Sequence, residues 1–294
     1  MMVQFFLCGW LSGHVFYAGL LMLTVMVSWC AWRSSAGRGF VVVASLTVTA
    51  LFMVLASGTP LPVLGYLILP VVAALWLALE RTRHRARVAA RAVVVAAAVT
   101  AAVYEWPYYA PPRVGAEPVE RVMLVGDSVT AGIGPAGEAT WGTLLAHAYD
   151  LPVVDVARAG ATVDSALAEQ APRLDQAGPG LVVLQIGGND MLYGTAVDQF
   201  ERRLNELVHR VARPGRRVVM LELPAFPLRE GHTRSQRRVA RQHGVTMIPR
   251  RYFLSVIRPA KATRDGVHLT EAGHRRMFEM IDRVVGPALA EAQR

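Results

Sequence analysis

The feature that most constrains this chain is a series of long apolar stretches, nearly free of charge, that all lie before residue 105. About 20 apolar residues are enough to cross a lipid bilayer as a helix. The candidate spans are 3–32, 40–56, 61–79 and 92–104. The last is short, and reaches the lower limit of about 17 residues only when 88–90 and Arg91 are included. The sequence therefore predicts an all-α transmembrane region of about four helices over residues 1–106.

The residues that flank these stretches favour membrane spans rather than a cleaved signal peptide. The first stretch lacks a basic start and ends in Trp-Arg-Ser-Ser, whereas a signal peptide ends in small residues. Arg91 is expected to extend its charge to one membrane surface. An aromatic group after the fourth stretch, Tyr104, Trp106, Tyr108 and Tyr109, is typical of the other surface. His14 and Thr24 are polar groups within the first stretch, and the histidine is expected to pack or bond against a neighbouring helix.

The arginines predict the orientation in the membrane. They lie between the first and second spans (Arg33 and Arg38) and between the third and fourth (81, 83, 85, 87 and 91), but not between the second and third. Because basic loops stay in the cytoplasm, both arginine loops are expected there. The sequence predicts a multi-pass protein of the cytoplasmic (inner) membrane, with everything after Tyr104 outside the cytoplasm.

Charge and cysteine content point to no special partner. The net charge is +9, carried almost wholly by arginine, with Lys261 as the lysine. Together with the abundant alanine and valine, this bias indicates a GC-rich genome and does not favour nucleic-acid binding. Cys8 and Cys30 both lie in the first apolar stretch, too far apart along one helix for a disulfide, and are interpreted as packing residues. Protein partners are not indicated by the sequence.

After a stiff, proline-rich linker at 107–118, the chain changes character. Apolar strands are expected near 121–125, 152–156, 181–186, 217–223 and 245–248. Helices are expected near 140–149, 162–176, 195–213, 232–243 and 270–285. Strands that alternate with helices indicate an α/β domain with a parallel sheet, here over residues 119–294.

Polar groups follow the ends of three of these strands. Gly126-Asp127-Ser128 follows the first, Ala159-Gly160 the second, and Asn189 the third, while Asp265 and His268 lie in a loop near the C-terminus. Open α/β sheets place their chemistry at this edge. A serine nucleophile needs a base in reach and a group that orients the base, and an Asp-x-x-His pair can supply both.

These blocks resemble the SGNH hydrolases, the GDSL esterase/lipase superfamily, over about residues 119–290. The resemblance implies a flavodoxin-like three-layer domain with a five-stranded parallel sheet in the order 2-1-3-4-5. It implies Ser128, His268 and Asp265 as catalytic residues, and an oxyanion hole formed by Ser128, Gly160 and Asn189. Val129, Asp155 and Ala159 depart from the commonest family residues, which is expected to affect the pocket wall more than the chemistry.

Other interpretations of the same residues are weaker. Gly126 to Thr130 lacks the second glycine of a Gly-x-Ser-x-Gly elbow. Gly-x-Gly-x-x-Gly at 132–137 contains Pro135 and does not open a helix after a strand, so no dinucleotide or other cofactor is predicted. No second histidine stands at a spacing suited to a metal. Asp127 and Asp190 are expected to bond loop backbone.

Several other residues are expected to be structural. Trp141 is interpreted as a core anchor, and the arginines at 229–241 as a solvated helix face. Four histidines are expected on the surface: His147, His209, His232 and His243.

These expectations converge on a membrane-anchored serine esterase that hydrolyses carboxylic esters, with acyl or acetyl groups on lipid or cell-envelope glycan as substrates. Two alternatives stay open. The same site in an acyltransferase or deacetylase would act on cell-envelope polysaccharide, and differ only in whether water or a sugar hydroxyl attacks the acyl-enzyme. In a non-catalytic membrane scaffold, the hydrolase domain would be idle.

Overall fold

The computed structural model describes residues 9–32, 38–80, 84–115, 119–225 and 229–290. The chain divides into two compact units. One is Gly9–Tyr109 with Ala225–Glu230, and the other contains Ala110–Pro224 and the chain from Gly231 onward. The division after Tyr109 falls inside the predicted linker 107–118.

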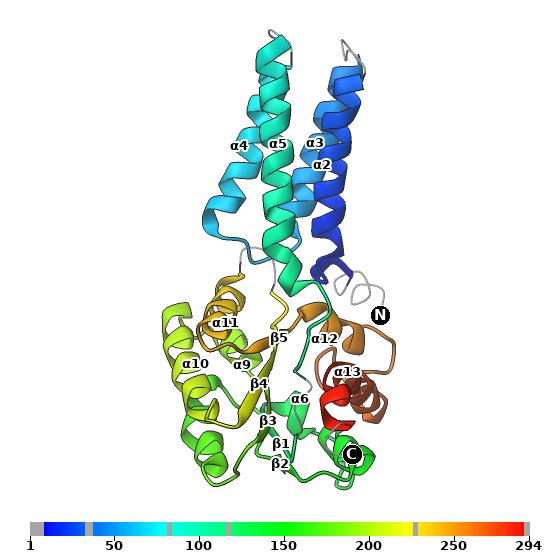
Figure 1. The fold of residues 1–294 in the computed structure, drawn as a ribbon. Coiled ribbons are helices and arrows are strands. Elements are labelled where there is room, and N and C mark those ends of the chain that lie inside the picture. The colour runs from blue at the N-terminus through cyan, green and yellow to red at the C-terminus, as the bar shows by residue number, and fades with distance from the viewer. Residues whose placement is uncertain (1–8, 33–37, 81–83, 116–118, 226–228, 291–294) are drawn as a thin grey trace. The chain divides into compact units, whose positions relative to one another are not determined.

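The first unit is helical. Its helices are α2 (His14–Trp32), α3 (Arg38–Ala56), α4 (Val63–Leu79) and α5 (His84–Glu105), followed by the short turn η1 (Trp106–Tyr108). As Figure 1 shows, α2 packs along α3, and α4 packs along α5. Their shared core includes Phe16, Leu23 and Trp76, all fully buried. Large apolar side chains such as Phe52 and Val103 remain exposed, as expected of a surface that contacts lipid.

Among the described residues, three helices are long and apolar enough to cross a bilayer: His14–Trp32, Gly39–Ala56 and His84–Tyr108. The helix α4, with 17 residues, is shorter. The expected short fourth span at 92–104 is therefore wrong in extent. Its helix begins at His84 because arginine and alanine are good helix formers, so the basic residues before Arg91 continue it.

The first span also differs from its expected length. In the described residues the helix begins at His14, after a turn in which Gly13 has φ 91°, rather than near residue 3. Cys30 is buried in the core of this unit. Cys8, Arg33, Arg81 and Arg83 lie outside the described residues. His14 bonds Tyr109 through its Nδ1, 2.7 Å from the phenol oxygen, which confirms the expectation that it bonds a neighbouring segment.

Arg91 makes contacts that the sequence did not predict. Its guanidinium pairs with Glu80, whose side chain is 5% exposed, and Nη2 donates to the Cys30 carbonyl at 2.6 Å. Trp76 Nε1 donates to the same carboxylate at 2.9 Å. A charge on an apolar helix is costly unless it is neutralised, so Arg91 and Glu80 satisfy each other and join α2, α4 and α5.

The second unit contains a fully parallel sheet. Its strands are β1 (Val122–Gly126), β2 (Val153–Asp155), β3 (Gly180–Gln185), β4 (Arg216–Leu221) and β5 (Thr246–Ile248). The order is β2-β1-β3-β4-β5, which confirms the flavodoxin-like order 2-1-3-4-5. Every residue of β1 and β3 is buried, as expected for strands covered on both faces.

Helices cover the sheet on both faces, as Figure 1 shows. One layer contains α7 (Trp141–Tyr149), α12 (Arg250–Ile257) and α13 (Glu271–Ala290). The other contains α8 (Val163–Ser165), α10 (Val197–Val211) and α11 (Gly231–Gln242). Trp141 is fully buried, which confirms it as a core anchor. The helix α12 was not predicted; it begins directly after Pro249, which occupies its N-cap position.

The helix expected at 162–176 is divided into three. After α8 come a π-helix, η2 (Ala166–Gln170), and a 3-10 helix, η3 (Ala171–Leu174). Pro172 has no N–H for an α-helical bond, and the wider π turn carries Gln170 toward β1. There Gln170 Oε1 accepts the Gly126 N–H at 3.0 Å, and Nε2 donates to the Gly126 carbonyl at 2.9 Å.

The arginines of α11 are not all on a solvated face. Arg237 is 1% exposed and lies 2.6 Å from a carboxylate oxygen of Glu222, which directly follows β4. Glu222 also accepts the backbone N–H of the buried Arg250. A buried carboxylate requires such partners, and no spacing in the sequence reveals that Glu222 would be buried. Similarly, His232 and His243 are half-buried and hydrogen-bonded, whereas His147 and His209 are exposed as expected.

Candidate active site

Ser128 begins the short helix α6 (Ser128–Ala131), two residues after β1 ends. Asp127 caps this helix, because its Oδ1 accepts the Val129 N–H at 3.0 Å. A Cβ on Gly126 would lie 2.5 Å from Thr130 Oγ1, so only glycine fits where the chain turns from strand into helix. The local sequence thus holds Ser128 at the carboxyl end of β1.

Gly160 lies in the loop after β2, the neighbour of β1. Its φ of 76° is in the left-handed region that favours glycine. The N–H of Arg158 donates to the Gly126 carbonyl at 3.1 Å, which joins this loop to the end of β1. The loop of Gly160 therefore lies beside the turn that carries Ser128.

Asn189 lies in the helix α9 (Gly188–Tyr193), which follows β3 on the other side of β1. Its Nδ2 donates to the Ala161 carbonyl at 2.9 Å, next to Gly160. Asp190 Oδ2 accepts the Val163 N–H at 2.9 Å, in the same segment. The loops after β2 and β3 are thus bonded to each other across the end of β1. These bonds confirm that Asp127 and Asp190 hold loop backbone.

Asp265 and His268 occupy one tight loop before α13. His268 Nδ1 lies 2.5 Å from Asp265 Oδ2, and Asp265 Oδ1 accepts the N–H groups of Val267 and His268. The structure brings this pair together as the Asp-x-x-His spacing predicts. In the described residues, the Nε2 of His268 and the hydroxyl of Ser128 make no hydrogen bond. Catalytic contacts without substrate are often long.

The carboxylates at the site have different pKa values. The His268 side chain and the loop N–H groups lower the pKa of Asp265 to about 2, so it is ionised at neutral pH. Burial raises the pKa of Asp127 to about 6, although its bond to Val129 and the nearby charge of His268 oppose this. Burial also raises the pKa of Asp190.

Sequence reasoning missed the polar residues that support the turn of Ser128. Besides Gln170, Gln185 at the end of β3 accepts the Thr130 hydroxyl at 2.9 Å. No spacing signal marks these glutamines. Among the residues that the structure describes, no group of three or more His, Cys, Asp or Glu side chains is arranged to hold a metal ion.

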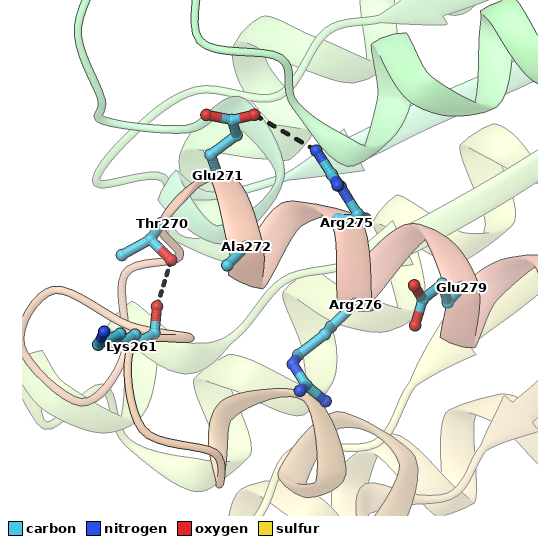
Figure 2. A pocket seen from close by; sticks show the side chains of 7 residues that line it. All are labelled: Lys261, Thr270, Glu271, Ala272, Arg275, Arg276 and Glu279. Carbon is cyan, nitrogen blue, oxygen red and sulfur yellow. Dashed lines mark hydrogen bonds and ion pairs between the residues drawn. The ribbon is translucent and has the colours of Figure 1, made fainter.

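A cavity of about 650 Å³ lies along the start of α13, and Figure 2 shows its lining. The lining residues are Lys261, Thr270, Glu271, Ala272, Arg275, Arg276 and Glu279. Most of these side chains are exposed, and Glu271 bonds Arg275 across one turn of the helix. The lining contains none of the predicted site residues, so this charged hollow is not taken as the place of the chemistry.

Exposed apolar residues gather instead in the segments that carry the site. In the described part of the second unit, every large apolar side chain that is well exposed lies close in sequence to Ser128, Asn189 or His268. They are Ile133, Leu192, Tyr193, Val197 and Val267.

Comparison with known proteins agrees with this architecture. Residues 124–276 match the model of the GDSL-like lipase/acylhydrolase family. The chain is 29% identical to the esterase TesA of Pseudomonas aeruginosa over 182 residues, covering 58% of this chain and 90% of TesA. It is 26% identical to thioesterase 1/protease 1/lysophospholipase L1 of Escherichia coli K12, covering 52% of this chain and 77% of that protein.

Solved structures match the second unit in the same way. A crystal structure of TesA matches with a TM-score of 0.52 and 27% identity, covering 57% of this chain and 99% of TesA. The esterase EstA from Pseudoalteromonas matches with a TM-score of 0.53 and 19% identity, covering 58% of this chain and 99% of EstA, and shows the fold alone. With the family match over more than half of its length, the fold and these relatives identify the chain as an ester hydrolase of the GDSL-like lipase/acylhydrolase family, an SGNH hydrolase preceded by apolar helices.

Proposed function

We propose that this chain is a membrane-anchored serine esterase whose acyl-enzyme forms on Ser128. The observation that carries the proposal is the Asp265–His268 pair, in which the ring Nδ1 of His268 is held 2.5 Å from the Asp265 carboxylate. In the proposed reaction, His268 takes the proton of Ser128 as the hydroxyl attacks the ester carbonyl. It then gives that proton to the leaving alcohol. Water attacks the acyl-enzyme in the second half.

The donors for the oxyanion come from three neighbouring strand ends. Ser128 and Gly160 offer backbone N–H groups, and Asn189 offers its second amide hydrogen, since the first is bonded to Ala161. Removing one such donor typically costs about 3 to 4 kcal/mol of transition-state stabilisation. The bonds between the loops after β2 and β3 support this role because they fix the donors before substrate binds.

The substrate class follows from the surroundings of the site. Leu192, Tyr193 and Val267 are 75%, 68% and 47% exposed and lie within four residues of Asn189 or His268. Exposed apolar groups of this size favour contact with an apolar partner. We therefore favour esters with an apolar acyl chain, such as lipids, over acetyl groups on a polysaccharide.

The helices of the first unit are proposed to anchor the chain in the cytoplasmic membrane, with the hydrolase domain outside the cytoplasm. The support is the length and apolarity of three helices and the arginines in the loops before α3 and around the start of α5. Cysteine accessibility to a membrane-impermeant reagent would test this orientation. Labelling of a cysteine placed at Arg294 from the cytoplasmic side alone would contradict it.

The proposed chemistry is tested with the full chain in detergent. A fluorophosphonate probe should label the wild type and fail to label Ser128→Ala, and the same substitution should abolish hydrolysis of p-nitrophenyl butyrate. Labelling that persists in Ser128→Ala would refute the assignment. A wild type that neither reacts with the probe nor hydrolyses esters would support an idle domain. Release of product onto a sugar acceptor, rather than water, would indicate an acyltransferase.

A further inference from the structure

A buried charged group lies beneath the glycine-rich segment that follows α6. Glu138, at the end of this segment, has a side chain that is 10% exposed. Its Oε1 lies 2.7 Å from Nη2 of Arg264, the residue directly before Asp265. Its Oε2 is buried and makes no hydrogen bond with the residues that the structure describes. A carboxylate that is removed from water in this way depends strongly on its one cationic partner.

The backbone makes room for this carboxylate at Gly134. A Cβ built on Gly134 would overlap the Glu138 carboxyl group and would lie 2.9 Å from Arg264 Nη2. Any larger residue would therefore displace the ion pair. Gly134 belongs to the Gly-x-Gly-x-x-Gly segment at 132–137, for which the sequence predicted no cofactor.

The loop that carries the proposed base is closed upon itself. Thr263 and Leu269 pair as an antiparallel bridge, and the Arg264 N–H donates to the His268 carbonyl at 2.8 Å. Because Asp265 also bonds the backbone and ring of His268, the loop is expected to move as one piece. The position of the imidazole relative to Ser128 then depends on what holds the loop from outside. The Arg264 side chain extends from the loop to Glu138, ten residues after Ser128.

A buried histidine of α13 bonds the start of α7, close to the glycine-rich segment. His274 is fully buried, and its Nδ1 accepts the Trp141 N–H at 3.4 Å. An accepting Nδ1 is unprotonated, so a neutral ring carries its proton on Nε2. A Cβ on Gly132 would lie 3.4 Å from this Nε2. His274 therefore lies directly under the segment that presents Glu138 to Arg264.

We propose that Glu138 and Arg264 are positioning residues of the esterase: their ion pair fastens the Asp265–His268 loop to the glycine-rich segment and so keeps His268 within reach of Ser128. This inference rests on the proposed function. It explains why a half-buried ion pair joins these two segments, since an arginine that served only solubility would not need a carboxylate removed from water. Misplacing a catalytic group by about 1 Å can reduce a rate by about a hundredfold.

The test compares Arg264→Gln, Glu138→Gln and the double variant in the full-length protein. The matched control is Arg210→Gln on α10. It removes an ion pair of similar length, in which Arg210 Nη2 lies 2.8 Å from Asp175 Oδ2 and the two side chains are 37% and 35% exposed. The measurements are the rate of fluorophosphonate labelling, kcat and KM for p-nitrophenyl butyrate, and Tm. We expect each single variant to lose about tenfold or more in labelling rate and kcat with KM within about twofold.

Two further results are expected of a positioning pair. The double variant should be no slower than the slower single variant, because both remove one interaction. Arg264→Lys should recover part of the rate, and Arg210→Gln should match the wild type. Labelling rates equal to the wild type in both single variants would overturn this inference alone, even if Tm fell. A wild type that the probe does not label would overturn the proposed function and this inference with it.

Discussion

The carboxylate of Asp265 holds His268 at two points, with Oδ2 2.5 Å from the ring Nδ1 and Oδ1 accepting the backbone N–H of His268 at 2.9 Å. The ring is therefore fixed in both tautomer and direction. The interaction lowers the pKa of Asp265 to about 2, so this support is present at every pH at which the protein is expected to work.

Replacing Asp265 by asparagine should reduce kcat by roughly 10² to 10⁴, because an amide nitrogen or a poorer acceptor beside Nδ1 favours the wrong tautomer. The backbone N–H groups of Val267 and His268 can still bond the amide oxygen. The loop should keep its shape, so Tm should change little. Steady-state hydrolysis and thermal unfolding of the variant check both points. Wild-type kcat in Asp265→Asn would contradict the role of the pair.

Asp127 should make the hydrolase domain less stable as pH rises from about 4 to about 6. Burial raises its pKa from 3.8 to about 6, so the folded state binds its proton more tightly than the unfolded state does. The contribution of Asp127 to stability is then fully present below about pH 4 and is lost as the pH rises through about 6. The difference corresponds to roughly 1 to 3 kcal/mol.

Asp127→Asn keeps the helix cap and removes this ionisation. The variant should therefore have a higher Tm than the wild type at pH 8, and nearly the same Tm at about pH 3.5, where Asp127 is protonated in both the folded and the unfolded state. Unfolding in detergent, followed by tryptophan fluorescence at the two pH values, gives the comparison. Equal Tm values at pH 8 would show that the charge of Asp127 does not destabilise the hydrolase domain.

Gln170→Ala should destabilise the turn before Ser128. It leaves the buried N–H of Gly126 without its side-chain acceptor, which costs about 1 to 3 kcal/mol for a buried unsatisfied group. The Gly126 carbonyl keeps the Arg158 N–H as a donor. Chemical denaturation measures the loss. Gln199 on the surface of α10 offers a control, since Gln199→Ala should change stability by less than about 0.5 kcal/mol.

Leu192 and Tyr193 should favour long acyl chains. Replacing both by serine should lower kcat/KM for p-nitrophenyl decanoate by about tenfold or more, since about 0.8 kcal/mol is lost for each methylene no longer removed from water. Hydrolysis of p-nitrophenyl acetate should change by less than about twofold. A parallel loss for both esters would indicate damage to Asn189 instead of a lost acyl contact.

The sequence was sufficient for the sheet because each strand is a short apolar run with a turn residue at its end. The strand β1 and its Gly-Asp-Ser turn are local features, and Asp265 and His268 lie three residues apart. Burial of Glu222 and the pairing of Arg91 with Glu80 were missed, because both depend on segments that meet only in the folded chain. The helix at 162–176 was divided for a similar reason, since the π turn serves a bond from Gln170 to another strand.

The five-stranded order has a consequence for how this enzyme can diversify. The proposed nucleophile, Ser128, follows the middle strand of the three neighbours β2-β1-β3. Its proposed partners lie on separate connections: Gly160 after β2, Asn189 after β3, and Asp265 and His268 in the loop before α13. Lengthening one connection would reshape the mouth of the reaction site without disturbing the other two. Replacing the segment between Gly194 and Val197 by the corresponding segment of a related enzyme should therefore change ester selectivity without changing the rest of the fold.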